Sequence, residues 1–375
     1  MTGANPPADF DVLALGELLV EMVATRGGPL SAAPGFTRAP GGAAANVAAG
    51  VARLGRQAAF AGLVGDDPFG RYLVSALAGY GVDTRWVGFH PRGRTPVVFV
   101  SKDAADDTDG EGAAHGPHGT QLLVYREGGA DQLFSPAAVP VRAVTGARIV
   151  VGSGVSLASA LPRAALHAAI AQAEADGVTV AFDVHWQPAR WQQPERARDL
   201  YHAVLPHVDI LMLSATELIM LTGGAASSEE ARLDAMLRAW VARLVGGRTR
   251  PLLVALTRGP AGCTYGLWRP GGTGFEVAHE AACDISVKDR TGAGDAFLAG
   301  LLVALLDHLA PLPARGEPTA APEHLDLGNL TLADVADIFT WANASGALAT
   351  TRRGTMAALP ARNTVLRLIH GRRGS

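Results

Sequence analysis

The chain has 375 residues, of which 48% are hydrophobic and 18% charged, and its formal net charge is −3. This length suits one large α/β domain or two ordinary ones, and the small charge gives no electrostatic reason to expect nucleic acid or an anionic membrane as a partner. The two cysteines, Cys263 and Cys283, are too few for a disulfide framework or a four-thiolate zinc site. Residues 1–9 lack the features of a signal peptide, and the most apolar stretch, 296–306, is too short to span a bilayer. We therefore expect a cytoplasmic protein.

Short apolar runs at six places predict buried β-strands. They cover residues 10–16, 58–63, 147–151, 178–182, 208–213 and 251–256. Helical stretches such as 161–176 and 227–245 lie between them. Because strands alternate with helices of this length, we expect an α/β fold with a central, mostly parallel sheet and helices on both faces.

Two stretches break this alternation. Residues 18–25 and 95–127 contain strand-like pieces without intervening helices, which predicts a small antiparallel sheet outside the main one. Residues 102–119 are rich in Asp, Gly and His, and the first half of the stretch 310–328 is rich in Pro. Both are expected to be flexible insertions.

The strongest local signal is the heptapeptide DRTGAGD at 289–295, directly before an apolar helix. Small residues at a helix N-terminus leave backbone N–H groups without partners at the positive end of the helix dipole, so Gly292, Ala293 and Gly294 can hold phosphate oxygens. A carboxylate in the first turn, Asp295, can take the proton of an attacking hydroxyl. On its own the motif is equally compatible with a tight turn and a capping aspartate. It is not a Walker loop, because no Gly-Lys-Ser/Thr follows.

A second glycine-rich stretch, GGAAANVA at 41–48, precedes an alanine-rich helix. Gly41 and Gly42 allow the backbone to come close to a ligand. Asn46, one turn into the helix, offers both a donor and an acceptor to sugar hydroxyls. The alternative is an ordinary glycine-rich loop before a helix that packs through its alanines.

Together these two stretches resemble the signature motifs of the ribokinase-like (PfkB) carbohydrate kinase family, and the resemblance covers about residues 12–360. It implies a single ribokinase-like domain over residues 1–375, with a lid formed by about 17–40 and 92–130. It also implies ATP-dependent transfer of a phosphoryl group to a sugar hydroxyl. In that reaction Asp295 is the catalytic base, and the amides of Gly292, Ala293 and Gly294 form the anion hole.

The same resemblance implies where the cofactors bind. ATP is expected along a Thr-x-Gly-x-x-Gly turn and beside a helix near the C-terminus, at Thr257, Gly259, Gly262 and Asn343. Mg²⁺ is expected to be held through water at the family's Asn-x-x-Glu motif, here Ser214 and Glu217, with Ser in place of the Asn. A monovalent cation, K⁺, is expected beside the anion hole, at Asp289, Thr291, Arg352 and Gly354.

The resemblance is less specific about the sugar. The family's substrate positions fall on Glu21, Gly41, Gly42, Asn46, Tyr125, Arg126 and Asp183. Tyr125 and Arg126 resemble a lid element of kinases for acid sugars, and an Arg in the cleft suits a carboxylate. We therefore expect 2-keto-3-deoxygluconate or a related keto-deoxy sugar acid. Against this, relatives have Asn and Arg where this chain has His185 and Gln187.

Three alternatives stay open at this point. The first is a fructokinase or another neutral-sugar kinase, and the second is a catalytically silent protein that binds a sugar or nucleotide. The third, an NAD-dependent dehydrogenase, fits the α/β alternation but lacks a Gly-x-Gly-x-x-Gly turn after the first strand. The expected partner is a small-molecule sugar, and exposed edges of the lid suggest a homodimer.

Overall fold

The computed structural model describes residues 10–102, 114–116, 120–188, 191, 193–224, 229–272, 274–311 and 325–373. Most of the two predicted insertions, 102–119 and 310–328, lies outside the described residues, so their flexibility stays a prediction.

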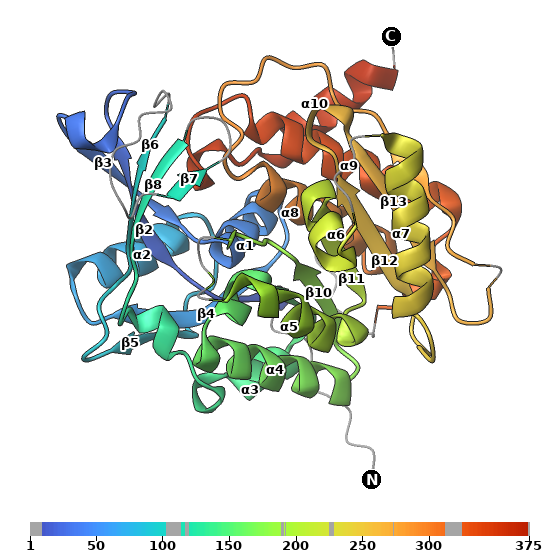
Figure 1. The fold of residues 1–375 in the computed structure, drawn as a ribbon, viewed down its shortest axis with the longest axis horizontal. Helices are drawn as coiled ribbons and strands as arrows, with labels where there is room; N and C mark the ends of the chain where they lie inside the picture. The colour runs from blue at the N-terminus through green and yellow to red at the C-terminus, as the bar shows by residue number, and fades with distance from the viewer. Residues whose placement is uncertain are drawn as a thin grey trace, which may run out of the picture.

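A nine-stranded sheet runs through the centre of the molecule (Figure 1). Its strands lie in the order β14-β13-β12-β11-β10-β9-β1-β4-β5. Their bounds are β1 Phe10–Leu15, β4 Ala58–Gly65, β5 Val87–His90, β9 Ala147–Ser153, β10 Thr179–Asp183, β11 Ile210–Ser214, β12 Leu252–Thr257, β13 Cys263–Trp268 and β14 Ala278–Glu280. Neighbours from β5 to β12 pair in parallel, whereas β13 and β14 pair antiparallel. The six predicted strands and the mostly parallel sheet are confirmed.

Sequence patterns do not predict β5, β13 and β14. β5 and β14 are the two edge strands of the main sheet, and β13 lies next to β14. Edge strands are partly exposed, and most residues of β5 and β14 are half-buried or exposed. They therefore lack the continuous apolar runs that mark the central parallel strands.

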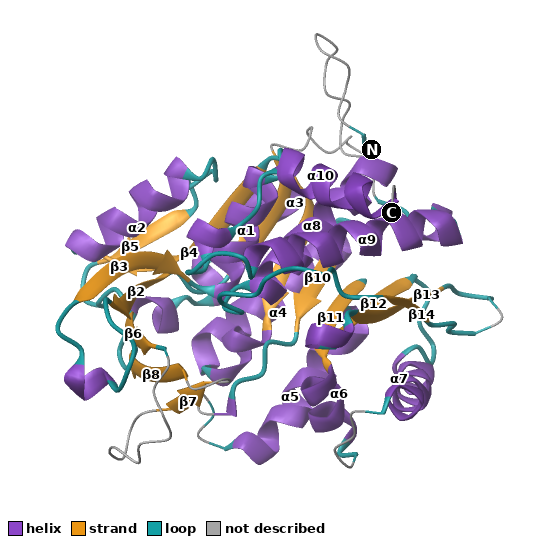
Figure 2. Ribbon diagram, turned by 90° about the horizontal axis from the view of Figure 1, so that it is seen from above, coloured by secondary structure: helices purple, strands orange, loops and turns teal. Residues whose placement is uncertain are grey.

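Helices cover both faces of the main sheet (Figure 2). Their bounds are α1 Ala43–Arg53, α2 Pro68–Gly79, α3 Val141–Thr145, α4 Ala160–Ala175, α5 Ala197–Val204, α6 Ala215–Thr222, α7 Glu230–Leu244, α8 Ala293–Leu309, α9 Leu332–Ala349 and α10 Arg362–Arg373. The predicted helix 227–245 thus begins at Glu230, and residues 225–228 lie outside the described residues. Within the described ranges, no helix combines the length and the apolar character needed to cross a bilayer.

Two hydrophobic cores lie on opposite faces of the sheet. Because successive side chains of a strand point to opposite faces, Val12 and Ala14 of β1 pack in one core, and Leu13 and Leu15 in the other. The first core contains residues of α1, α8 and α9, and the second contains residues of α4, α5 and α7. Each fully buried Val or Leu contributes about 1.5–3 kcal/mol. The helix that carries Asp295 is therefore firmly anchored.

A second sheet, here called the small sheet, lies at the left of Figure 1. Its order is β3-β2-β6-β8-β7. The strands are β2 Leu19–Ala24, β3 Phe36–Gly41, β6 Val97–Ser101, β7 Ala114–Gly116 and β8 Thr120–Tyr125. All neighbours pair antiparallel except β2 and β6, which pair in parallel. The predicted sheet is present, but this one pair departs from the antiparallel prediction. The chain between β2 and β6 passes through β3, α1, β4, α2 and β5, and it returns in the same direction.

Candidate active site

Helix α8 begins at the DRTGAGD motif, and its N-terminus faces a cavity. Gly292 caps the helix in the left-handed conformation, with φ of 77°, which L residues with a side chain rarely adopt. Asp295 lies in the first turn and is 5% exposed. The N–H of Ala293 donates to the carbonyl of Arg290 at 3.2 Å. The expected anion hole is therefore only partly open, since Ala293 already has a partner, whereas the amides of Gly292 and Gly294 are the ones best placed for a ligand.

Asp295 is held by the second predicted motif. The side-chain amide of Asn46, in α1, donates to Asp295 Oδ2 at 2.7 Å. The Asn46 carbonyl oxygen, Oδ1, is buried and has no hydrogen-bond partner among the described residues. The two glycine-rich motifs, far apart in the chain, thus meet at one carboxylate.

His185 and Asp183 approach the same carboxylate from the carboxyl end of β10. His185 Nδ1 lies 3.2 Å from Asp183 Oδ2, and Gln187 Nε2 lies 3.0 Å from His185 Nε2. Ligand atoms of Asp183, His185 and Asp295 all lie within 4.8 Å of one another. His185 has a positive φ of 40°, which costs backbone energy and directs its ring toward this cluster.

The cluster has unusual acid–base properties. Burial raises the pKa of Asp295 to about 6, although nearby His185 and the Asn46 hydrogen bond counteract this effect. Burial alone would lower the pKa of His185, but Asp183 outweighs it and raises that pKa to about 9. Near neutral pH the site therefore holds an imidazolium beside a carboxylate that can still accept a proton.

Two glutamates from the first part of the chain face the same space. Glu17 Oε1 accepts the N–H of Ala43 at 3.0 Å, while its other oxygen, Oε2, is buried without a partner among the described residues. Glu21 Oε2 accepts the hydroxyl of Thr355 at 3.1 Å, and burial raises the pKa of Glu21 to about 7. Gly42 is required here because a Cβ at this position would lie 2.2 Å from the Glu17 carbonyl oxygen.

Most of these groups line a cavity of about 570 Å³ between the small sheet and the N-terminus of α8, whereas Asp183 lies behind His185 and is not part of the lining. The volume is sufficient for a small ligand. Its polar lining comprises Glu17, Glu21, Asn46, Lys102, His185, Gln187, Asp289, Arg290, Thr291, Asp295 and Thr355. Apolar residues of the small sheet, including Val98, Val100 and Leu122, form the opposite wall.

Tyr125 and Arg126 do not line this cavity. Tyr125 is 62% exposed and packs edge-to-face against Phe99. The Arg126 guanidinium contacts Asp131, whose side chain is almost completely buried. The structure therefore differs from the expectation that Arg126 reaches into the cleft, because a neighbouring carboxylate already holds its charge.

The residues expected to bind nucleotide lie apart from the cavity lining, mostly at the carboxyl ends of β11 and β12. Ser214 and Thr257 are paired neighbours on these strands. Gly259 and Gly262 belong to the turn after β12, and Asn343 in α9 donates to the carbonyl of Ala281 at 2.5 Å. Their contact with ATP stays a prediction.

Ser214 and Glu217 form a capping box at the start of α6. Glu217 Oε2 accepts from the N–H of Ser214 at 2.6 Å, and Oε1 accepts from the N–H of Trp186 at 2.7 Å. Burial raises the pKa of Glu217. Through the hydrogen bond to Trp186, the carboxylate fixes the segment that carries His185. Its role toward Mg²⁺ stays a prediction.

Asp289 anchors the loop before α8. Its carboxylate accepts hydrogen bonds from Thr291, from the N–H of Gly354 and from Lys102. Burial opposes ionisation, but these donors together hold the pKa of Asp289 below its usual range. The expected cation-site residues Asp289, Thr291 and Gly354 are neighbours, whereas within the described part of the chain no hydrogen bond or ion pair joins the exposed Arg352 to them. Their role toward a cation stays a prediction.

Sequence reasoning does not find Glu17, Lys102 and Thr355 as site residues. Glu17 lies within the first-strand segment, where only Glu21 is singled out. Lys102 directly follows β6, and Thr355 directly follows Gly354, one of the expected cation-site residues. Nearness to these positions is the one signal in the sequence. Their side chains reach the site only through the packing of the small sheet on the main domain.

An α/β sheet whose carboxyl end meets a buried carboxylate and the amides of a helix N-terminus has the groups that a phosphoryl-transfer enzyme needs. The profile of the pfkB family of carbohydrate kinases matches residues 9–362. The chain therefore belongs to this family and is a carbohydrate kinase.

Similar proteins support this assignment. The chain is 32% identical over 359 residues to fructokinase-1 of Oryza sativa subsp. japonica, covering 96% of this chain and 97% of that protein. It is similar to the structure of a fructokinase with bound ATP from Xylella fastidiosa, with a TM-score of 0.77, 28% identity and coverage of 97% and 99%. It is also similar to a fructokinase double mutant from Vibrio cholerae O395 in a form with fructose, ADP and potassium bound, with a TM-score of 0.71, 27% identity and coverage of 97% and 99%.

Proposed function

We propose that this kinase phosphorylates a hydroxyl of a neutral sugar, with fructose as the first candidate, using ATP. The observation that carries the proposal is the pair of buried acceptors without partners, Glu17 Oε2 and Asn46 Oδ1, beside Asp295. Sugar hydroxyls can donate to these oxygens, and leaving them unpaired would cost about 1–3 kcal/mol each. The carboxylate group of a sugar acid has no proton to donate to these two oxygens.

This proposal replaces the sugar-acid expectation with its neutral-sugar alternative. Arg126, on which that expectation depended, pairs with Asp131 and is not among the residues that line the cavity. Gln187 stands where relatives have an Arg, and Arg190, a possible replacement, lies outside the described residues. The names of the similar proteins, which are fructokinases, agree with a neutral sugar.

In the proposed reaction Asp295 accepts the proton of the sugar hydroxyl while that oxygen attacks the γ-phosphoryl group. The amides of Gly292 and Gly294, and that of Ala293 once it leaves the Arg290 carbonyl, receive the charge on the phosphoryl oxygens. Thr257, Gly259 and Gly262 would bind ATP. Glu217 would hold Mg²⁺ through water, and the ion would neutralise charge on the phosphates.

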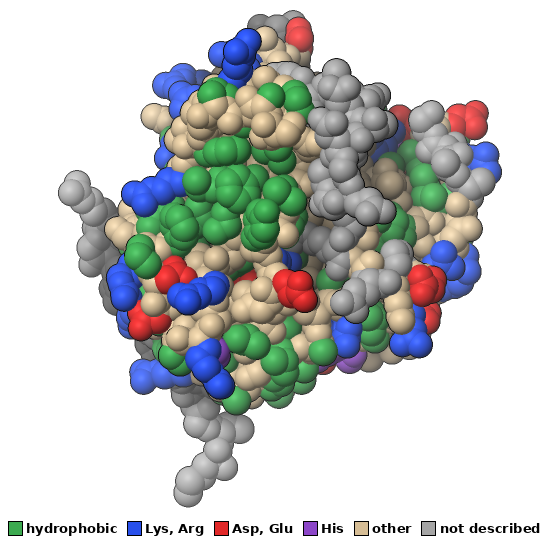
Figure 3. All heavy atoms as spheres, turned by 60° about the vertical axis from the view of Figure 1, so that its left-hand side comes forward, with side chains coloured by type: hydrophobic (Ala, Val, Ile, Leu, Met, Phe, Trp, Pro, Cys, Tyr) green, Lys and Arg blue, Asp and Glu red, His purple; other side chains and the backbone are tan. Residues whose placement is uncertain are grey.

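We further propose that the small sheet acts as the lid over the sugar, because its apolar residues Val98 and Val100 form the wall opposite Asp295. Such a cover excludes water and suppresses hydrolysis of ATP. Its outer face carries Phe36, Phe99 and Tyr125 in edge-to-face contacts, and hydrophobic side chains gather on this side of the molecule (Figure 3). This surface supports a homodimer through the small sheet, which sedimentation velocity can test. The two free, buried cysteines suit the cytoplasm.

The substrate assignment is tested by measuring ADP release with fructose, other neutral sugars and 2-keto-3-deoxygluconate at matched concentrations. We expect kcat/KM to be highest for a neutral ketose. A higher kcat/KM for the sugar acid would contradict the proposal, and no turnover of any sugar would contradict the kinase reaction itself.

Arg126→Ala separates the two substrate classes further. Because Arg126 pairs with Asp131 and does not line the cavity, the variant should keep the KM for fructose. It should instead lose about 3 kcal/mol of stability in chemical denaturation, since the nearly buried Asp131 loses its partner. The double variant Arg126→Ala with Asp131→Ala is the control and should recover part of this loss. A selective rise in KM for a sugar acid would restore the sugar-acid interpretation.

A further inference from the structure

A lysine next to the small sheet contacts the loop before α8. Lys102 follows directly after β6, and its Nζ contacts Asp289 Oδ2 and lies 3.3 Å from the hydroxyl of Thr291. The side chain of Lys102 is 22% exposed and that of Asp289 only 4%. Both residues line the cavity that contains Asp295.

The Asp289 carboxylate is already fully used. An ionised carboxylate offers about four acceptor positions. Oδ1 accepts from the N–H of Thr291 at 3.0 Å and from its hydroxyl at 2.7 Å. Oδ2 accepts from the N–H of Gly354 at 2.9 Å and from the ammonium group of Lys102. The residues therefore do not fit an additional potassium ion on Asp289, since the cation that they hold is the ammonium group of the chain itself.

An ammonium group can do the electrostatic work of a monovalent cation at this position. It carries one compact positive charge, as potassium does. It neutralises Asp289, and so removes repulsion between that carboxylate and an incoming phosphate group. It also fixes the turn from Asp289 to Thr291, which leads directly into the amides of Gly292 and Gly294.

We propose that Lys102 is a tethered replacement for the monovalent cation, and that this kinase therefore works without potassium. Lys102 is a positioning residue that acts through Asp289, not a group that touches the reacting atoms. Because Lys102 adjoins the small sheet, its charge reaches the anion-binding turn only while that sheet covers the cavity. Closure over the sugar and completion of the phosphoryl site are thus one event. The inference rests on the proposed role of the α8 turn and is independent of which sugar is accepted.

The first test compares salts on the unmodified enzyme. ADP release is measured with Mg-ATP and an accepted sugar in NaCl, KCl and NH₄Cl at equal ionic strength. We expect the same kcat in the three salts. A kcat several-fold higher in KCl than in NaCl would overturn the proposal.

The second test removes the tethered charge. In NaCl, Lys102→Ala should lose on the order of 10- to 100-fold in kcat, the size of loss that follows removal of an outer-shell partner at a metal site. NH₄Cl and KCl should then restore part of the activity, because the free cation can enter the vacated position. A merely structural lysine would show no such rescue. Lys102→Ala with normal kcat in NaCl, or with a loss that neither cation relieves, would contradict the proposal.

Lys288→Ala is the matched control, because it removes one positive charge from an exposed position adjacent to Asp289. It should keep its kcat and stay insensitive to the choice of salt. A measurement without substrate completes the design: KCl, compared with NaCl, should raise the Tm of Lys102→Ala but not that of the wild type. This readout needs no sugar, so it distinguishes failure of the cation proposal from failure of the proposed function.

Discussion

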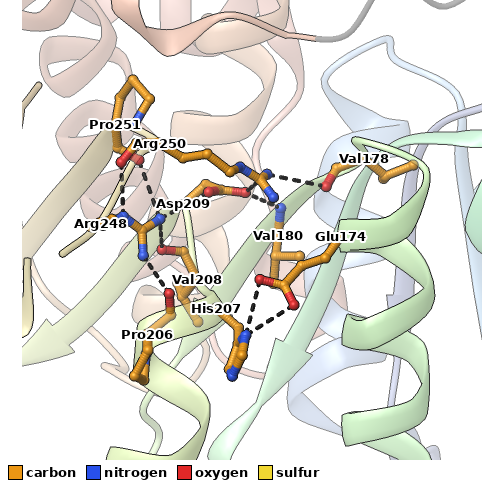
Figure 4. A network of polar contacts seen from close by, with 10 residues as sticks. All are labelled: Glu174, Val178, Val180, Pro206, His207, Val208, Asp209, Arg248, Arg250 and Pro251. Carbon is orange, nitrogen blue, oxygen red and sulfur yellow. Dashed lines mark hydrogen bonds and ion pairs between the residues drawn. The ribbon is translucent and has the colours of Figure 1, made fainter. Parts of the chain in front are cut away.

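A buried aspartate lies at each end of the parallel strands, Asp209 at the amino end and Asp295 at the carboxyl end. The two differ in how many hydrogen-bond donors surround the carboxylate. Asp209 directly precedes β11 at the amino end, where donors surround it (Figure 4). Arg248 Nη2 lies 2.9 Å from Oδ1, Arg250 contacts Oδ2, and the N–H of Val180 donates to Oδ2 at 3.0 Å. Arg248 also donates to the carbonyls of Pro206, Val208, Arg250 and Pro251, so one ion pair ties several loop positions together.

Asp295, at the opposite end, has far fewer donors. Among the described residues, Asn46 donates a hydrogen bond to its side chain, and His185 adds a positive charge nearby. Burial raises the pKa of both aspartates, but only at Asp209 do two arginines counteract it. A carboxylate whose acceptor positions are filled holds the fold together, whereas one with acceptor positions to spare can take a proton. The environment, not the residue type or its burial, separates the two roles.

The largest expected effect is on turnover. Asp295→Asn should reduce kcat by about 10²–10⁴-fold, because it removes the proposed base, while the fold and ATP binding are kept. Steady-state kinetics and nucleotide titration measure these two properties. Asp209→Asn is the control at the other end and should keep its kcat at a temperature where it is folded. Near-normal turnover in Asp295→Asn would refute the assignment of the base.

The second largest expected effect is on the stability of the fold, and it concerns Asp209. Asp209→Asn should lower the free energy of unfolding by about 3 kcal/mol, because Arg248, with only 6% of its side chain exposed, loses its counter-charge. Urea denaturation measures the loss, with Asp295→Asn as the comparison. We expect Asp295→Asn to lose much less, since fewer partners depend on it. A loss below about 1 kcal/mol for Asp209→Asn, the range of an exposed ion pair, would remove the contrast.

The smallest effect is a shift in pH dependence. Asp295 can act as a base only when ionised, so kcat/KM should fall as the pH drops through about 6. His185, with a pKa raised to about 9, is protonated there and favours the ionised form of Asp295. His185→Asn should therefore move this acid limb to higher pH, with less than about a tenfold change in rate at neutral pH. Gln187→Ala, which alters the same loop without removing a charge, should leave the limb in place. An acid limb that stays or moves to lower pH in His185→Asn would contradict this arrangement.

The site could be predicted only in part. Local chemistry singles out Asp295 and the glycines of the α8 turn, because small residues at a helix start leave backbone N–H groups accessible to an anion. Arg126 shows the limit of that reasoning. Its place in a motif suggested that it binds the carboxylate of a substrate. In the structure it forms an ion pair with Asp131, five positions further on, and does not line the cavity. A sequence motif can identify a residue, but it does not predict which neighbouring side chain that residue will bind.

The sequence by itself determined the parallel strands, because continuous apolar runs can be satisfied only by burial on both faces, and it determined the α8 turn through its glycines. Three features were decided only by the tertiary structure. Asn46 donates to Asp295, Glu17 Oε2 has no partner among the described residues, and the ammonium group of Lys102 contacts Asp289. These are contacts between segments remote in the chain, so their geometry depends on how the small sheet and the helices pack rather than on any local pattern.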